Sequence, residues 1–587
     1  MKLSWLKHFE HSLHHFIFLI FCCIYLLRLY HTGITYHRFE KVLNEDAFGY
    51  YSILPAVFKY HDPQFQFLDS SVRRLPAYSH YIPPVVNKAP NGRKVIKYYS
   101  GVALLQLPFY LAGDILARDT PATGYEPVYH FAILVSVAFY LLLGLFLCKR
   151  ILAGFGIHPV AASVLPFIML FGSNLYCYTT YDPAYSHVYS FFALTAFLYF
   201  LIKLKSRFSP WNAIASGMMF GLIVFIRPLN GIAILFVPIV FGSGSLNTFF
   251  RKQHLGKTVL IVLSCLGILS IQSMLWFWQT GLFYVYPYGQ EKLTLLNPRI
   301  AELVFSFDSG WAIYTPLPFL ALLFSIIALI IRKQYFRSVM VILCSFAILY
   351  LLSCWYYLHY GCTAGCRPIT EFYGPLIVLC GYSISGLHLK KWLRYLMFVT
   401  TAALIYYNQV IHFQFYEHIL NWCHMDREKF SMVFMKTHPA YRYATSEPWD
   451  FSGAGKSPSV TRLPLNNSIS INDLKTSDTI NVFLPSLDPG DSSLLLDISF
   501  KCLMKDELNE SFVRFLLSDK GKYVDLQNLL LRKEINRVDQ YHDIHFEMLI
   551  SKPVKKGTLH IRLESVDKRG TTILKFNDIA IRRIAMN

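Results

Sequence analysis

Charged residues are scarce in this sequence of 587 residues: Asp, Glu, Lys and Arg together make up 16% of it, and only 36 of them are acidic. Hydrophobic residues make up 54%, and the mean hydropathy is positive at +0.37. The formal net charge of +19 would suit a nucleic-acid-binding protein if the chain were soluble. Here much of the basic excess flanks long apolar runs, which is typical of a membrane protein and disfavours nucleic acid as a partner.

Several motifs that would indicate other functions are missing. The sequence contains no Walker loop, dinucleotide-binding fingerprint, zinc-ligand spacing or G-x-S-x-G elbow, which disfavours a nucleotide-powered pump. It shows no internal repeat, which a transporter would predict. The first apolar run lacks a small-residue cleavage site, so we expect it to remain as a membrane span.

Eleven apolar runs approach the roughly 20 residues that a membrane-spanning helix needs. They cover residues 16–32, 130–147, 159–178, 186–202, 211–226, 231–241, 259–278, 311–331, 339–354, 373–387 and 396–411. Clusters of Lys and Arg follow the second, fourth, sixth, eighth and tenth runs. Because cytoplasmic loops carry the excess of positive charge, this alternation predicts a cytoplasmic N-terminus and a C-terminal tail on the outer side.

The predicted parts of the chain are a transmembrane domain at 1–412, a connector at 413–447 and a separate domain at 448–587. The first outer loop, at 34–129, carries two aromatic, apolar segments at 47–60 and 102–117 that we expect to lie flat on the membrane. In the last part, apolar and polar residues alternate between turn signals, which predicts an antiparallel β-sandwich. The expected fold class is therefore a polytopic α-helical membrane protein with a C-terminal extracytoplasmic β-sandwich domain.

Two aspartates near the outer face are candidates for acid–base chemistry. Asp46 follows the first span, and a half-desolvated carboxylate there would have a raised pKa and could act as a general base. Glu45 is the competing base. Asp182 precedes Pro183 at the outer start of the fourth span. The alternative interpretations are structural: Asp46 would cap a helix, and Asp182 would start a turn or cap the span.

Three cations also lie on the outer side. Lys97 precedes the second flat segment, whereas Arg227 and Arg367 lie in outer loops against the usual charge bias. Each arginine therefore calls for a partner, and a phosphate or anionic headgroup would suit a guanidinium well. The alternative partners are acidic residues of the outer loops, namely Asp46, Asp182 and Glu291.

Aromatic residues gather in the same loops. Tyr288, close to Glu291, lies between the seventh and eighth spans, Tyr314 lies near the start of the eighth, and Trp355 follows the ninth. Such rings suit the binding of sugars, but aromatic belts at membrane interfaces form without any ligand. Both interpretations stay open from the sequence.

These features together resemble the GT-C superfamily of membrane glycosyltransferases, especially the bacterial branch near the protein mannosyltransferases and the lipid A aminoarabinose transferases. The resemblance covers about residues 16–441. Degenerate motifs carry it: Glu45-Asp46 with Tyr50-Tyr51, Lys97 in a stretch without the family's prolines, Asp182, Arg227, Gly310 to Pro316 with Tyr314, and Trp355, Gly361 and Gly365-Cys366-Arg367.

The resemblance implies that a sugar passes from a polyprenyl-phosphate donor to a glycan, lipid or protein acceptor at the outer face of a bacterial inner membrane. The C-terminal domain would then be periplasmic, and inversion is the simpler stereochemical expectation. The residues it implicates are Asp46 and Asp182 in catalysis, Lys97, Arg227 and Arg367 in binding the donor phosphate, and Glu45, Tyr50, Tyr288, Glu291, Tyr314 and Trp355 in binding substrate. It implies no required cofactor, although metal-dependent relatives leave a divalent metal open.

Two other functions stay open. A transporter or flippase of a lipid-linked glycan would also have many spans, but it predicts charges near the middle of the bilayer. A non-catalytic envelope assembly protein would tolerate the loss of Asp46, Arg227 and Arg367.

Overall fold

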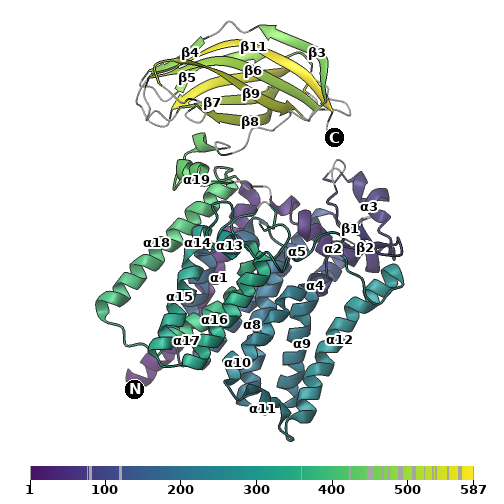
Figure 1. Ribbon diagram of the computed structural model, residues 1–587, viewed down its shortest axis with the longest axis vertical. Helices are drawn as coiled ribbons and strands as arrows, with labels where there is room; N and C mark the ends of the chain where they lie inside the picture. The colour runs from purple at the N-terminus through teal and green to yellow at the C-terminus, as the bar shows by residue number, and fades with distance from the viewer. Residues whose placement is uncertain are drawn as a thin grey trace. The chain divides into compact units, whose positions relative to one another are not determined.

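The computed structural model describes residues 2–36, 38–75, 77–78, 82–117, 122–358, 360–361, 363–421, 423, 425–442, 445, 455–464, 468–472, 476–486, 493–505, 511–520, 522–531, 535, 538–550, 554–565 and 571–585. The chain divides into two compact units, Met1–His412 and Phe413–Asn587. The first unit is built mostly of helices and the second mostly of strands (Figure 1). The expected fold class of a helical membrane protein with a C-terminal β-domain is confirmed, and the extracytoplasmic side of that domain stays a prediction.

Each of the eleven predicted spans falls on a helix. The helices are α1 (Lys2–Thr35), α5 (Pro127–Gly154), α6 (Pro159–Phe171), α8 (Ser186–Ser206), α9 (Pro210–Ile226), η3 (Pro228–Leu235) continued by α10 (Phe236–Phe241), α12 (Leu255–Thr280), α15 (Pro316–Ile331), α16 (Tyr335–Ser353), α17 (Tyr373–Ile384) and α18 (Lys391–Tyr416). The shorter elements between them are η1 (Arg38–Glu40), α2 (Glu45–Phe58), α3 (Phe67–Ser70), η2 (Val72–Arg74), β1 (Val86–Lys88), β2 (Lys94–Ile96), α4 (Gly101–Leu116), α7 (Cys177–Thr180), α11 (Ser245–Phe250), α13 (Ile300–Phe305), α14 (Trp311–Tyr314) and η4 (Arg367–Phe372).

Helix length separates these spans into two groups. Within the described residues, α1, α5, α8, α12, α16 and α18 are long and apolar enough to cross a membrane. The other helices are shorter, and α6 ends at Phe171 although its apolar run continues to residue 178. The helix stops where Gly172-Ser173-Asn174 favours a turn, and the Asn174 amide donates instead to the carbonyl of Ala364 at 3.0 Å. The number of spans stays a prediction.

The basic ends of several helices meet at one end of the bundle. The Lys205 Nζ, on α8, donates to the carbonyl of Val240 on α10 at 2.5 Å. Arg337, in the first turn of α16, donates to the carbonyl of Ile239 at 3.3 Å and to the Tyr382 hydroxyl on α17 at 3.0 Å. We call the end that carries Lys205 and Arg337 the basic end. Its cytoplasmic orientation stays a prediction from the positive-inside rule.

The first outer loop has helices in both predicted places, α2 and α4, and an aromatic core between them. The Tyr125 hydroxyl donates to the Ser52 Oγ of α2 at 2.9 Å, and the Tyr129 hydroxyl donates to Asp114 of α4 at 2.7 Å. The buried tyrosines of this core are Tyr51, Tyr78, Tyr110, Tyr125 and Tyr129. Hydroxyl hydrogen bonds satisfy Tyr51, Tyr78, Tyr125 and Tyr129, whereas the buried hydroxyl of Tyr110 has no partner among the described residues. That the two helices lie flat on a membrane stays a prediction.

A small hairpin of β1 and β2 holds the loop that follows α12. The amide of Asn87 donates to the carbonyl of Pro287 at 2.8 Å, and the amide of Asn91 donates to the carbonyl of Thr280 at 2.7 Å. Segments about 190 residues apart are therefore tied together at the end of α12. This contact fixes the loop at 282–299 beside the first outer loop.

The second unit contains two antiparallel sheets. Its strands are β3 (Gly455–Pro464), β4 (Ser468–Asn472), β5 (Thr476–Phe483), β6 (Ser493–Met504), β7 (Ser511–Asp519), β8 (Lys522–Leu530), β9 (Tyr541–Ile550), β10 (Gly557–Ser565) and β11 (Thr571–Ala585), preceded by α19 (Arg427–Val433) and η5 (Pro439–Tyr441). One sheet has the order β5-β10-β7-β8, and the other has β3-β11-β6-β9, with β4 also pairing β11. On β10, Leu559, Ile561 and Leu563 enter one buried core shared by both sheets. The predicted β-sandwich is confirmed.

Candidate functional site

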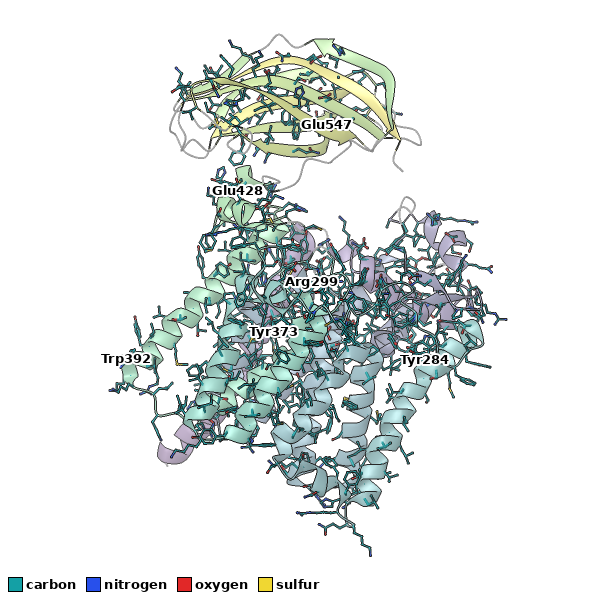
Figure 2. The ribbon with its side chains drawn as sticks, in the orientation of Figure 1. Tyr284, Arg299, Tyr373, Trp392, Glu428 and Glu547 are labelled. Carbon is teal, nitrogen blue, oxygen red and sulfur yellow. The ribbon has the colours of Figure 1, made fainter. Side chains whose placement is uncertain are left out.

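Six parts of the chain bring polar side chains to the end of the bundle opposite the basic end. They are the start of α2, the segment before α4, the start of α8, the junction of α9 and η3, the loop at 282–299, and η4. α8 shows the separation, because it begins at Ser186 beside this site and ends at Ser206 at the basic end, about 30 Å away. Figure 2 labels Tyr373, which directly follows η4, and Tyr284, in the loop after α12.

Among the carboxylates predicted for the site, Asp46 has both an ion pair and a side-chain hydrogen bond. Its Oδ2 pairs with the Arg367 Nη2 at 2.9 Å, and its Oδ1 accepts a hydrogen bond from the Tyr98 hydroxyl at 2.7 Å. Burial alone would raise the pKa of Asp46, but Arg367, Tyr98 and Lys97 hold it below its usual value. Asp46 is therefore ionised and anchored by the cation that we predicted to bind phosphate.

The alternative interpretation of Asp46 as a helix cap is wrong. The N-cap of α2 is Asn44, and Asp46 lies inside the first turn with its carboxylate directed to Arg367 and Tyr98. Asp182 is likewise not the cap of α8, because that position belongs to Tyr185. Both aspartates are therefore available for long-range contacts.

Arg227 pairs with a carboxylate that the sequence analysis did not consider. The Arg227 Nη1 lies 2.6 Å from Glu371 Oε1, which also accepts from the His187 Nδ1 at 2.9 Å. The Asn230 amide donates to the other oxygen of Glu371. Burial would raise the pKa of Glu371, but Arg227, His187 and Asn230 lower it to about 2. The suggested pairing of Arg227 with Asp46, Asp182 or Glu291 is therefore wrong, whereas the suggested pair of Arg367 with Asp46 is correct.

Lys97 and Glu291 form a third ion pair. The Lys97 Nζ lies 2.6 Å from Glu291 Oε1, and both side chains are partly buried. Lys97 also acts on the charge of Asp46. The loop at 282–299 thus contributes a carboxylate that positions Lys97 beside the predicted base.

Asp182 is a second carboxylate whose charge interacts with Arg367. Its Oδ1 pairs with the Arg38 Nη2 at 3.0 Å, and the Arg38 guanidinium stacks 3.5 Å from the centre of the Tyr181 ring. Burial raises the pKa of Asp182 above its usual value, although Arg38 and Arg367 oppose the rise. Tyr185, under the guanidinium of Arg367 at 5.5 Å, interacts with both aspartates. Both aspartates therefore interact with Arg367, Asp46 as its ion-pair partner and Asp182 through its charge.

Three of the predicted aromatic residues border this charged cluster. Tyr50 packs against Tyr98 with ring centres 4.6 Å apart and interacts with Arg227. Tyr288 is near both Tyr50 and Arg227, and its ring meets that of Trp355 edge-on at 5.7 Å. Trp355 is thus one layer farther from the charges.

Tyr314 and Glu45 were also predicted to bind substrate, and that role stays a prediction. The Tyr314 hydroxyl donates to the carbonyl of Phe307 at 2.7 Å, and its Cβ lies beneath Gly365. Tyr314 therefore supports the loop that presents Arg367. Glu45 is exposed at the start of α2 with a φ of 44°, and its charge acts on Tyr185.

The arginines retain free donor capacity. Within the described part of the chain, the Nε atoms of Arg38 and Arg367 are buried and have no hydrogen-bond partner. A buried, unpaired donor beside a positive charge favours an anion. Among the described residues, no three His, Cys, Asp or Glu side chains are grouped to hold a metal ion. Metal dependence stays a prediction.

Sequence reasoning missed Glu371 and Arg38. Glu371 lies four residues after Arg367, in Arg-Pro-Ile-Thr-Glu, at the start of an apolar run. A lone acidic residue in front of a predicted span is a detectable signal, because a buried charge needs a partner. Arg38 follows the first span closely and resembles an ordinary interfacial cation, so its pairing with Asp182 had no comparable signal.

Comparisons with known proteins give limited information. No family model matches the sequence, and no curated protein does. Among solved structures, the chain is similar to arabinosyltransferase EmbB from Mycobacterium smegmatis, with a TM-score of 0.30 and 10% sequence identity. The match covers 80% of this chain and 58% of the EmbB chain. A likeness of this size carries no conclusion about function.

Proposed function

We propose that the protein is a membrane glycosyltransferase of the GT-C type. It transfers a sugar from a polyprenyl-phosphate donor to a glycan, lipid or protein acceptor at the outer membrane face. The single observation that supports this proposal is the ion pair of Asp46 with Arg367. Lys97 acts on the charge of Asp46, and Arg227 acts on that of Arg367, so the carboxylate interacts with a cluster of three cations.

The cations suit a leaving phosphate. A guanidinium has five N–H donors, and Arg367 uses one of its terminal nitrogens for Asp46 while its Nε has no partner among the described residues. Arg227 similarly contacts Glu371 through Nη1. A phosphate between the two arginines would take their remaining donors, and its growing negative charge would be stabilised as the sugar leaves.

Asp46 is the proposed general base. While it is paired with Arg367, its lowered pKa makes it a weak base. When the donor phosphate takes over Arg367, burial dominates, and the pKa of Asp46 rises. The acceptor oxygen then bonds to the anomeric carbon of the sugar. The bond between that carbon and the oxygen of the donor phosphate breaks, and the acceptor proton moves to Asp46. A single displacement of this kind inverts the anomeric centre. Asp182, whose pKa is raised by burial, is the second candidate base.

The position of the cluster at one end of the helices fits a lipid-linked donor. The polyprenyl tail can stay in the bilayer while its phosphate reaches the arginines, so no nucleotide site is needed. Tyr288 and Trp355, next to the charges, are proposed to stack on the sugar. Because side-chain cations supply the positive charge, we propose that no metal is required.

Replacement of the base tests the proposal. We expect Asp46→Asn to lower the release of polyprenyl phosphate from a panel of polyprenyl-phosphate sugars by about 100-fold or more, since it removes a proton acceptor. Asp69→Asn is the matched control, because Asp69 is an exposed aspartate of the same outer loop, paired to Arg73 within one helical turn. Release is measured in reconstituted membranes with equal protein.

The same experiment separates the alternatives. Unchanged release in Asp46→Asn would remove Asp46 as the base. Movement of a lipid-linked glycan across the bilayer without any transfer would favour a flippase. If neither process occurs and Asp46→Asn, Arg227→Gln and Arg367→Gln variants all support growth, the protein is an assembly component.

A further inference from the structure

An apolar groove runs along the helical bundle toward the basic end. It is lined by residues of α8, α10, α15, α16 and α17 and has a cavity volume of about 210 Å³. Trp311 and Ile369 line one end, and Lys205 and Arg337 line the other. Along α17 it extends from Tyr373 to Tyr382, or about 14 Å.

The charges of this groove are all at its basic end. Among the described residues that line it, the charged ones are Lys205 and Arg337. Arg227 and Arg367, which belong to the candidate active site, do not line it. A phosphate-bearing lipid in the groove would therefore place its phosphate at the basic end, away from Asp46.

Lys205 and Arg337 have neutral contacts. Lys205 donates to the carbonyl of Val240, and Arg337 donates to the carbonyl of Ile239, to Gln334 and to the Tyr382 hydroxyl. Their two positive charges also interact with each other.

No acidic residue occurs in the sequences of α8, α10, α15, α16 or α17. Two neighbouring cations on acid-free helices favour an anion supplied from outside the chain.

We propose that the groove binds an anionic phospholipid from the leaflet at the basic end. One acyl chain lies along the apolar walls, and the headgroup phosphate sits between Lys205 and Arg337. Basic pockets between transmembrane helices recognise anionic headgroups in this way. The site is separate from the donor site, so this lipid is a bound structural or regulatory ligand and not a substrate.

Native mass spectrometry of the full chain tests the site. The protein is released from nanodiscs of phosphatidylcholine alone or mixed with phosphatidylglycerol, and the retained lipid is counted. We expect selective retention of phosphatidylglycerol by the unaltered protein. The double variant Lys205→Gln with Arg337→Gln should lose this retention by about tenfold or more. Lys391→Gln is the matched control, since Lys391 is an exposed cation at the start of α18 that does not line the groove.

A second variant tests the apolar part. Ser345→Phe places a ring in the groove wall and should reduce retention without any change of charge. If the double variant does not fold, retention by the unaltered protein must still fall as salt rises, because the contact is electrostatic. Equal retention of the two lipids, or displacement of phosphatidylglycerol by polyprenyl phosphate at equal concentration, would overturn the proposal.

Discussion

Glu371 shows how single residues balance charge at the candidate site. It is fully buried, and it accepts hydrogen bonds from Arg227, His187 and Asn230. A buried carboxylate that has one cation and two further hydrogen-bond donors keeps its charge. Burying either charge of the ion pair without its partner would cost folding free energy. Glu371 therefore holds Arg227 in place and leaves its other nitrogens for a ligand.

Removing this carboxylate should destabilise the fold. We expect Glu371→Gln to lower the free energy of unfolding by about 3 kcal/mol at pH 7, because Arg227 loses its partner. The pKa of Glu371 is about 2 in the fold against a usual 4.5, so its stabilisation is complete above about pH 4.5 and is lost toward pH 2. The melting temperature of Glu371→Gln should therefore approach that of the unaltered protein at low pH, where Glu371 no longer stabilises the fold.

Glu302→Gln is the control for this measurement, since Glu302 is an exposed acid on α13. Thermal unfolding in detergent at neutral and acidic pH gives both melting temperatures. An equal loss in the two variants at pH 7 would show that the Glu371 pair adds no stability.

At the scale of elements, the short loop before η4 presents Arg367 to Asp46. Gly361 and Gly365 have φ angles of 89° and 71°, in the left-handed region that favours glycine. Gly365 also packs on Tyr314, since a Cβ there would lie 2.8 Å from the Tyr314 Cβ. The loop geometry therefore depends on both α14 and its own glycines.

A methyl group at this position should disturb the site. We expect Gly365→Ala to cost about 1–3 kcal/mol of stability through backbone strain and the clash with Tyr314. Because Arg367 would shift, activity should fall by about tenfold or more. Gly92→Ala is the matched control: its φ is also positive at 80°, but nothing lies within 4 Å of the added Cβ. Melting temperature and donor turnover are measured for both, and equal effects would contradict a role for the Tyr314 contact.

At the scale of the whole molecule, the chain consists of two units with separate cores. The core of the β-rich unit takes Phe500 and Ile579 from one sheet and Phe515 and Ile561 from the other. Two sheets that bury a shared apolar layer can fold without help from a membrane.

We therefore expect a fragment of residues 448–587 to fold by itself. It should be soluble, give a β-type far-ultraviolet circular dichroism spectrum and unfold in one cooperative transition. Phe515→Ala in this fragment should cost about 3–5 kcal/mol, since Phe515 is fully buried. A fragment with a random-coil spectrum would show that the unit depends on the rest of the chain.

The residues of the candidate site show which contacts could be predicted from the sequence. Arg367 was identified because a cation in an outer loop runs against the inside bias, and Asp46 was identified from its position after the first span. The pairs of Arg227 with Glu371 and of Asp182 with Arg38 were missed, because neither Glu371 nor Arg38 was among the candidate residues. The substrate role of Tyr314 stays a prediction, whereas its contacts with Phe307 and Gly365 follow from local packing that the sequence does not show.

The sequence by itself determined that this chain is a helical membrane protein with a β-rich tail, because hydrophobic period and charge alternation are local properties. Only the tertiary structure decided which carboxylate meets which arginine, and that Lys205 and Arg337 meet at the foot of one groove. Ion pairing depends on distances of a few ångströms between helices far apart in the chain. Such distances follow from packing, which a linear pattern does not encode.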